Sequence, residues 1–143
     1  MRQVRRSALV PYTAQAMFDL VDDVASYPEF LPWCSDAVEH ERNDEQVRAT
    51  LELHKGSMSK RFTTLNTREP GASLTMDLVD GPFRHLEGVW RFEPVGDSGS
   101  KVALHIDFEF SSPVLSLMFG SFFEQTCSSL VDAFTRRARE VYG

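Results

Sequence analysis

Residues 86–110, LEGVWRFEPVGDSGSKVALHIDFEF, alternate between two kinds of side chain on both sides of a central turn. In the first half, every second residue is apolar or glycine, namely Leu86, Gly88, Trp90 and Phe92. The second half places apolar side chains at every second position from Val102 to Phe110. Between the halves, the stretch VGDSG has the composition of a hairpin turn. This pattern predicts two antiparallel strands with one apolar face and one wet face.

The same period of two extends upstream from this hairpin as far as Asp36. It is clear at Val47, Ala49, Leu51 and Leu53, and again at Leu74, Met76 and Leu78. Polar or turn-forming residues interrupt it at 43–45, 55–57, 69–71 and 80–82. Residues 3–10 form a further short extended run that ends at Pro11. The sequence therefore predicts an antiparallel meander of about six strands, plus one strand at the N-terminus.

A helical period appears on both sides of the predicted sheet. Near the N-terminus, Thr13 is a suitable N-cap for a helix with apolar positions at Ala16, Phe18, Leu20, Val21 and Val24, which should end before Pro28. A second short helical turn is expected over Glu29–Trp33. After Pro113, a helix of nearly thirty residues is predicted, about 40 Å long at roughly 1.5 Å per residue.

The predicted C-terminal helix has one broad apolar face. Its members are Leu115, Phe119, Phe122, Phe123, Thr126, Leu130, Ala133, Phe134 and Val141. Arg137 falls within this face, where it could either extend to solvent or mark the mouth of an opening. Because a sheet with one apolar face needs a cover, this helix is expected to pack against it. The fold class is thus α+β, as one domain over residues 1–143.

Composition limits the classes of function. The formal net charge of −6 argues against DNA or other nucleic acid as a default partner, since phosphates would be repelled. Cys34 and Cys127 match no metal or redox motif, and we expect free thiols in a reducing compartment. The short apolar run after the basic start is not typical of a signal peptide, and no stretch is long enough to span a bilayer. We therefore expect a cytoplasmic protein.

Residues 24–34, VASYPEFLPWC, contain three aromatic side chains between two prolines. Pro28 and Pro32 prevent a long helix, and exposed aromatic rings are unfavourable in water. We interpret this segment as a bent flap that lies against something apolar. That surface is either the core of the protein or a ligand beside the mouth of a cavity.

Four stretches together resemble one superfamily. YPEFLPWC, GPFRHLEGVWRFEP, DFEF and LVDAFTRRAREVYG are similar to the START (Bet v 1-like, SRPBCC) proteins, in particular to coenzyme Q-binding, polyketide cyclase-like proteins and ribosome association toxins. The resemblance covers the whole chain and implies a helix-grip fold. In that fold, a curved seven-stranded antiparallel sheet surrounds a long C-terminal helix, with two short helices after the first strand.

The resemblance implies two functions that the sequence does not separate. One is binding of ubiquinone (coenzyme Q) or a related isoprenoid lipid between sheet and helix, as a carrier or chaperone with transient membrane contact and without a required cofactor. The other is docking on the large (50S) ribosomal subunit, which would block 70S formation and inhibit translation initiation. A cyclase or dehydratase activity is a third and weaker hypothesis, because the predicted inner face offers almost no acid or base.

Sixteen apolar residues are candidates for the ligand site. Each either fills the core or lines a cavity, and the pattern alone does not decide between the two. They are Tyr27, Phe30, Leu31, Trp33, Met58, Phe62, Met76, Leu78, Phe83, Leu86, Trp90, Phe108, Phe110, Phe119, Phe123 and Leu130.

Polar residues suggest fewer sites. The four histidines are scattered without zinc-site spacing, and His105, Asp107 and Glu109 are expected on the wet face of one strand. The carboxylates of Asp22 and Asp23 are expected at the surface. Basic clusters at 2–6 and 136–139 either complement local charge or form a patch for ribosomal RNA or anionic lipid.

Overall fold

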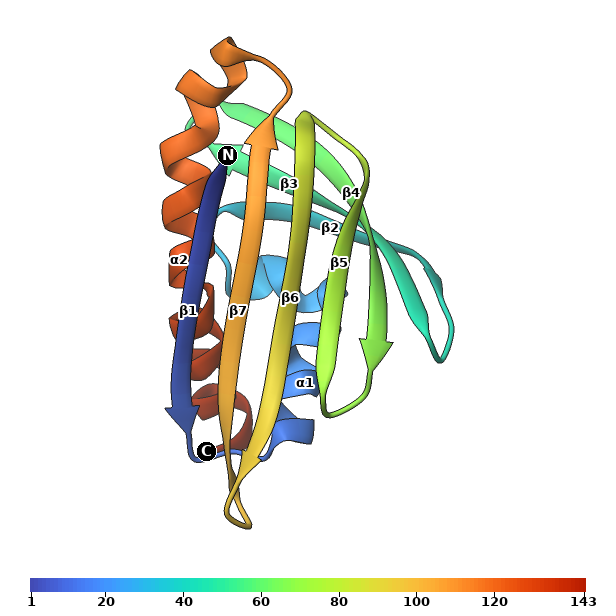
Figure 1. Ribbon diagram of the computed structural model, residues 1–143, viewed down its shortest axis with the longest axis vertical. Helices are drawn as coiled ribbons and strands as arrows, with labels where there is room; N and C mark the ends of the chain where they lie inside the picture. The colour runs from blue at the N-terminus through green and yellow to red at the C-terminus, as the bar shows by residue number, and fades with distance from the viewer.

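The computed structural model describes residues 1–143, folded as one antiparallel sheet that wraps around a long helix (Figure 1). The strands lie in the order β1-β7-β6-β5-β4-β3-β2. Their bounds are β1 Arg2–Val10, β2 Cys34–Arg42, β3 Gln46–Lys55, β4 Met58–Glu69, β5 Ser73–Asp80, β6 Phe83–Val95 and β7 Gly99–Phe110. The α+β helix-grip fold is confirmed, and all four predicted breaks in the meander fall within one residue of the turns between strands.

The hairpin of β6 and β7 is the longest ladder of the sheet. Trp90 pairs with Leu104 and Phe92 with Val102, and all four side chains are buried. Arg91, between Trp90 and Phe92, and Lys101, next to Val102, are exposed. This alternation confirms the predicted strands, and it directs one continuous apolar face toward the interior.

The predicted helix after Pro11 is shorter than expected. Helix α1 spans Ala14–Asp22, with Thr13 Oγ1 accepting a hydrogen bond from the backbone N–H of Ala16 at 3.1 Å. A 3₁₀ helix, η1, then covers Val24–Glu29 and includes Pro28. The expected turn over Glu29–Trp33 is therefore wrong. The helical turn lies earlier in the chain and ends at Glu29. At its end, the N–H groups of Phe30 and Leu31 both donate to the carbonyl of Tyr27.

Helix α2, Pro113–Tyr142, has the predicted length and begins at an N-cap, Ser112, whose side chain accepts from the N–H of Leu115. Most of the predicted apolar face is buried, but Val141 is half exposed, contrary to expectation. The last turn is held instead by Tyr142. Its hydroxyl donates to the carbonyl of Ala16 at 2.9 Å, and its ring lies 5.9 Å from that of Tyr12.

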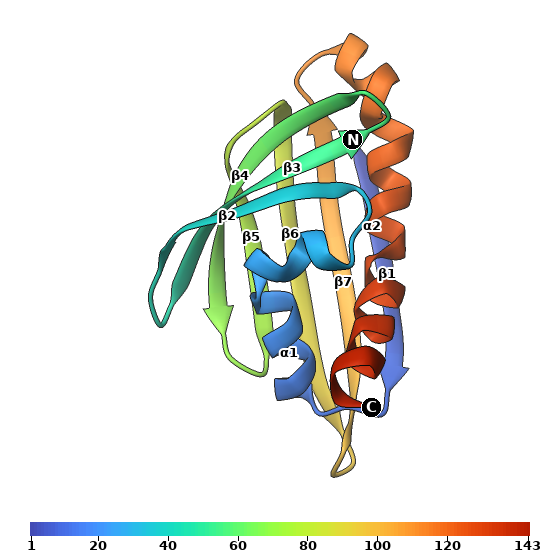
Figure 2. The same ribbon diagram turned by 180° about the vertical axis from the view of Figure 1, so that it is seen from behind.

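The sheet is strongly curved, so that β2, β3 and β4 cross over the interior while β1 and β7 stay beside α2 (Figures 1 and 2). Register shifts in the β2–β3, β4–β5 and β6–β7 pairings accompany the bend, consistent with the effect of β-bulges on curvature. Helices α1 and η1 close the remaining open side (Figure 2). None of the helices has the length and apolar character needed to cross a membrane.

Candidate functional site

A cavity of about 70 Å³ lies between the concave face of the sheet and the middle of α2. Fourteen of its eighteen lining residues are hydrophobic. The lining residues are Val24, Tyr27, Trp33, Ala49, Leu51, Phe62, Thr64, Asn66, Met76, Leu86, Gly88, Trp90, Ile106, Phe123, Thr126, Cys127, Leu130 and Phe134. No Asp, Glu or His side chain is among them, so the cavity holds no carboxyl or imidazole group for acid–base chemistry.

Small side chains leave this space open. Ala49 on β3, Gly88 on β6 and Thr126 on α2 face the cavity where larger residues would fill it. At Gly88, an added Cβ would lie 2.6 Å from the terminal methyl of Met76. Met76 thus occupies the room that a side chain at position 88 would take. Because methionine is flexible, this part of the wall can change shape.

Eight of the sixteen candidate residues line the cavity: Tyr27, Trp33, Phe62, Met76, Leu86, Trp90, Phe123 and Leu130. Phe83, Phe108, Phe110 and Phe119 pack on one another instead, beyond one end of it. Leu31 is fully buried, and Phe30, Met58 and Leu78 are half-buried against the core. A ligand-binding role for any of these residues stays a prediction.

Three polar residues lie in the cavity wall, and of these only Thr126 was predicted to face inward. Thr64 and Asn66 on β4 are buried, and the hydroxyl of Thr64 donates to Oδ1 of Asn66 at 2.8 Å. Thr126 lies opposite on α2 and is also buried. A signal was present in the period of two, since Thr64 and Asn66 share the parity of Phe62. Together they give an apolar cavity one hydrogen-bonding wall.

The cavity adjoins an outer hollow at Trp33. This hollow, about 430 Å³, lies between α2 and the turn from β3 to β4, and Trp33 and Thr126 line both spaces. The indole Nε1 of Trp33 is buried and has no hydrogen-bond partner. A buried donor without a partner is costly, so an acceptor placed beside it would be stabilised. Trp33 thus borders both the cavity and the outer hollow, with an unpartnered N–H group.

The flap predicted at 24–34 packs against the protein itself. The Tyr27 hydroxyl donates to the carbonyl of Val21, and its ring lies 5.4 Å from that of Phe134. Burial raises the pKa of this hydroxyl, and the charge of Asp22 adds to the rise. Arg137 does not line the cavity: its guanidinium stacks over the ring of Phe30 at 4.9 Å and pairs with Glu29.

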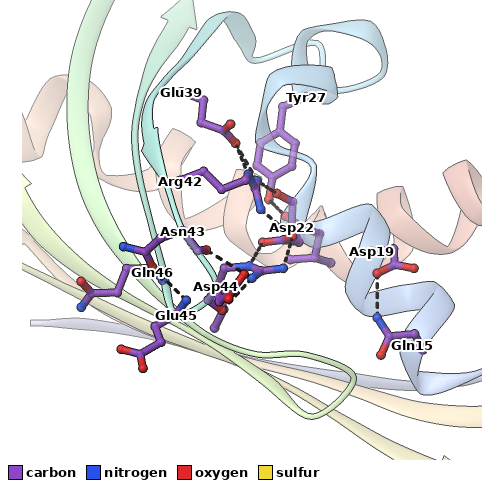
Figure 3. A network of polar contacts seen from close by, with 12 residues as sticks. Gln15, Asp19, Asp22, Tyr27, Glu39, Arg42, Asn43, Asp44, Glu45 and Gln46 are labelled. Atoms are coloured by element: carbon purple, nitrogen blue, oxygen red, sulfur yellow. Dashed lines mark hydrogen bonds and ion pairs between the residues drawn. The ribbon is translucent and has the colours of Figure 1, made fainter.

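An ion-pair network around the buried Asp22 lies beside the flap (Figure 3). Asp22, predicted at the surface, is buried at the end of α1. Its carboxylate accepts hydrogen bonds from Arg42 on β2 at 2.9 Å and from Arg68 on β4 at 2.9 and 3.0 Å. The correction has a tertiary cause, because two arginines far away in sequence converge on this carboxylate. The network fixes α1 and η1 to the curled half of the sheet.

Both cysteines are free and buried. Burial raises the pKa of Cys34 to about 11 and raises that of Cys127 further, which keeps both thiols protonated. Cys127 lines the cavity but lacks a base beside it, so neither thiol is placed as a nucleophile.

On the outer face of β7, His105 lies 3.0 Å from Asp107, and both are half-buried.

A family model described as "Polyketide cyclase / dehydrase and lipid transport" matches residues 10–135. The chain belongs to this family. Two curated relatives are named "Ribosome association toxin RatA". The one from Vibrio cholerae is 50% identical over the whole chain and 99% of its own length, and the one from Pseudomonas aeruginosa is 47% identical over 98% and 97%.

More distant members are also similar. "Coenzyme Q-binding protein COQ10 homolog B, mitochondrial" of Xenopus laevis is 32% identical over 96% of this chain and 58% of its own. The solution structure of the 18 kDa protein CC1736 from Caulobacter crescentus has a TM-score of 0.77 at 31% identity, covering 100% and 99% of the two chains. The Zhui aromatase/cyclase of a Streptomyces species has a TM-score of 0.83 at 16% identity, covering 96% and 93%, a likeness of fold alone.

Proposed function

We propose that the protein associates with the ribosome, docking on the large subunit and hindering its joining with the small subunit. The observation that carries this proposal is the similarity, along the entire chain, to proteins named ribosome association toxins. Such a role implies a cytoplasmic location and needs no catalytic group.

Sedimentation tests this function. Purified ribosomal subunits are mixed at a magnesium concentration that permits joining, with increasing amounts of the protein, and resolved on sucrose gradients. We expect the protein to co-sediment with the large subunit and the joined-ribosome peak to shrink with dose. A protein that stays at the top of the gradient at low salt, with the joined peak unchanged, would remove this proposal.

A second function is favoured by the cavity. We propose that it takes an apolar guest, with ubiquinone or a related isoprenoid as the leading candidate. Support comes from the apolar lining, the family description and the coenzyme Q-binding relative. Ligand pockets usually measure roughly 300–1,000 Å³, so the cavity has to widen, and Trp33 and Met76 are the side chains placed to move.

The polar wall of Thr64, Asn66 and Thr126 limits which polar group the guest can carry. Whichever way the Asn66 amide is turned, one of its two polar atoms pairs with Thr64 and the other is left for a guest. No charged residue lines the cavity, so an ionised head group would be buried without a partner. A neutral carbonyl or hydroxyl group fits, and a quinone ring supplies carbonyls. We propose binding rather than turnover for the same reason.

Quenching of tryptophan fluorescence tests the guest. Both tryptophans, Trp33 and Trp90, line the cavity, so a bound quinone lies close to both indoles. Titration with a ubiquinone carrying one isoprene unit is expected to quench emission to saturation. Ala49→Leu fills the cavity and should weaken binding about tenfold or more, whereas Phe110→Leu, outside the cavity, should not. Absence of saturation, or equal affinity in both variants, would contradict cavity binding.

A further inference from the structure

Several exposed cations of this acidic protein have no ion-pair partner and lie close together. Arg5 on β1, Arg91 on β6 and Lys101 on β7 are exposed, and none forms a salt bridge. All three lie on the outer face of the sheet, away from α2. Figure 1 looks onto this side of β1, β7 and β6.

The register of the strands brings these cations together. Arg5 pairs with His105, Arg91 pairs with Ala103, and Lys101 lies two residues before Ala103 on the same face. With strands about 4.8 Å apart and about 3.3 Å per residue, the backbone positions of Arg5 and Arg91 lie roughly 12 Å apart. A shallow hollow of about 350 Å³ runs between them. Its lining residues are Arg5, Arg6, Ser7, Val89, Arg91, Lys101, Ala103, Leu104 and His105.

The basic clusters at 2–6 and 136–139 are partly neutralised by neighbouring carboxylates. Arg2 pairs with Glu124 at 3.3 Å, and Arg137 pairs with Glu29 and Glu140 at 3.4 and 3.6 Å. These two arginines are already neutralised by carboxylates. The N-terminal cluster contributes Arg5 to a different group, with two cations that are nearly one hundred residues away in sequence.

Acidic groups near the hollow are few. Glu93 pairs with Lys101 across the hairpin but forms no salt bridge with it, and Asp107 is held by His105. Arg6 also faces the groove that holds Glu124 and Asp132, so its charge is partly opposed. The lining of the hollow itself contains Arg5, Arg6, Arg91 and Lys101 and no carboxylate, so the hollow is positive on a chain of net charge −6. Farther along the same face, Glu87 lies opposite Asp107, and Glu109 pairs with Arg84 at 3.7 Å.

We propose that this outer face, carried by Arg5, Arg91 and Lys101, is the surface that binds the phosphate backbone of ribosomal RNA. The inference rests on the proposed ribosome association and names its contact surface. Unpaired cations in a shallow groove suit closely spaced phosphates. Ser7 and Ala103 between them are small, so a backbone can approach. A membrane-binding face would need several apolar side chains to insert, and near Lys101 the large exposed apolar residues are Leu9 and Val95.

The test compares two triple variants with the same change in charge. The first is Arg5→Gln/Arg91→Gln/Lys101→Gln. The matched control, Arg48→Gln/Lys60→Gln/Arg136→Gln, removes three exposed cations that also lack salt bridges but lie elsewhere. Binding to large ribosomal subunits and to deproteinised ribosomal RNA is measured between 50 and 200 mM salt, and circular dichroism checks the fold.

We expect the first variant to lose about tenfold or more in affinity for both targets at low salt. Its slope of log affinity against log salt should fall by about 3, one for each phosphate contact. The control should match wild type. If wild type binds neither target, the proposed function itself fails. If wild type binds subunits and the first variant binds equally well, the surface is wrong while the function stands.

Two further outcomes also decide against RNA. Wild type that binds subunits but not deproteinised RNA would assign this face to a ribosomal protein. Loss of binding to vesicles of phosphatidylglycerol and phosphatidylcholine, with subunit binding retained, would assign it to anionic lipid. Either result would overturn the inference.

Discussion

Two neighbouring parts of the interior are built from the same apolar residue types, yet one is filled and the other hollow. Near the start of α2, Phe83 and Phe110 stack with ring centroids 4.6 Å apart, and Phe108 meets Phe123 edge-on at 4.8 Å. We name Phe83, Phe108, Phe110 and Phe119 the aromatic cluster. Farther along α2, the cavity begins at Phe123, which belongs to both regions.

The difference arises from what stands between the large side chains. The aromatic cluster has large rings on every facing position, so edges and faces interlock. Around the cavity, Trp33, Met76 and Trp90 face Ala49, Gly88 and Thr126, which are too small to meet them. An aromatic stripe therefore does not by itself indicate a ligand site. The small residues on the opposing strands and helix decide whether space remains.

The largest effect is expected in the aromatic cluster. Phe108 is fully buried and touches three other rings, so Phe108→Ala should lower the free energy of unfolding by about 3–5 kcal/mol. Urea denaturation followed by circular dichroism measures this. A loss below about 1 kcal/mol would mean that the cluster is not tightly packed.

The second-largest loss of stability is expected when the ion pairs of Asp22 are removed. Asp22→Ala leaves Arg68 without its carboxylate partner, while Arg42 keeps Glu39. Because these groups are only partly shielded from solvent, we expect a loss of about 2 kcal/mol in the free energy of unfolding. Arg61→Ala, which removes exposed pairs with Asp36 and Glu52, is the control and should cost clearly less than Asp22→Ala. Equal losses would show that burial of Asp22 does not matter.

A smaller effect is expected at the cavity wall. Met76 is only half-buried and borders empty space, so Met76→Ala should cost about 1 kcal/mol, well below Phe108→Ala. The enlarged cavity should also bind the short-chain quinone more tightly in the fluorescence titration. A loss as large as that of Phe108→Ala would erase the distinction between the two regions.

The buried Cys34 thiol should make the free energy of unfolding depend on pH above pH 9, but not near neutral pH. Because burial raises the pKa of Cys34 from 9.0 to about 11, the folded protein holds this proton longer than the unfolded chain. The corresponding stability is fully present below pH 9 and is lost as the pH rises toward 11. Unfolding free energies of wild type and Cys34→Ala, measured from pH 8 to 11, should therefore converge. Parallel curves would mean that the thiol is not shielded.

The regular elements were accessible from the sequence because their signals are local. The alternation at 86–110 predicted β6 and β7, and the period after Pro113 predicted α2. Burial of Asp22 was not accessible, since it depends on Arg42 and Arg68 reaching α1 from the sheet. The grouping of Arg5 with Arg91 and Lys101 likewise depends on strand order, because β1 pairs with β7 across the whole chain.

The cavity could be predicted only in part from the sequence. Its aromatic lining could be predicted as apolar and inward, but its position depends on which small residues face those rings. Thr64 and Asn66 had the right parity, and their burial follows only from the curl of β4 over α2. Periodicity therefore identified the inner face of the sheet without locating the space within it.

Cryo-electron microscopy of the protein bound to large ribosomal subunits tests the central claim most directly. The account predicts density for the chain on the subunit, with the outer face of β1, β7 and β6 against ribosomal RNA and Trp33 facing away from it. Particles without added density at saturating protein, or density seated through the α2 side of the molecule, would contradict it.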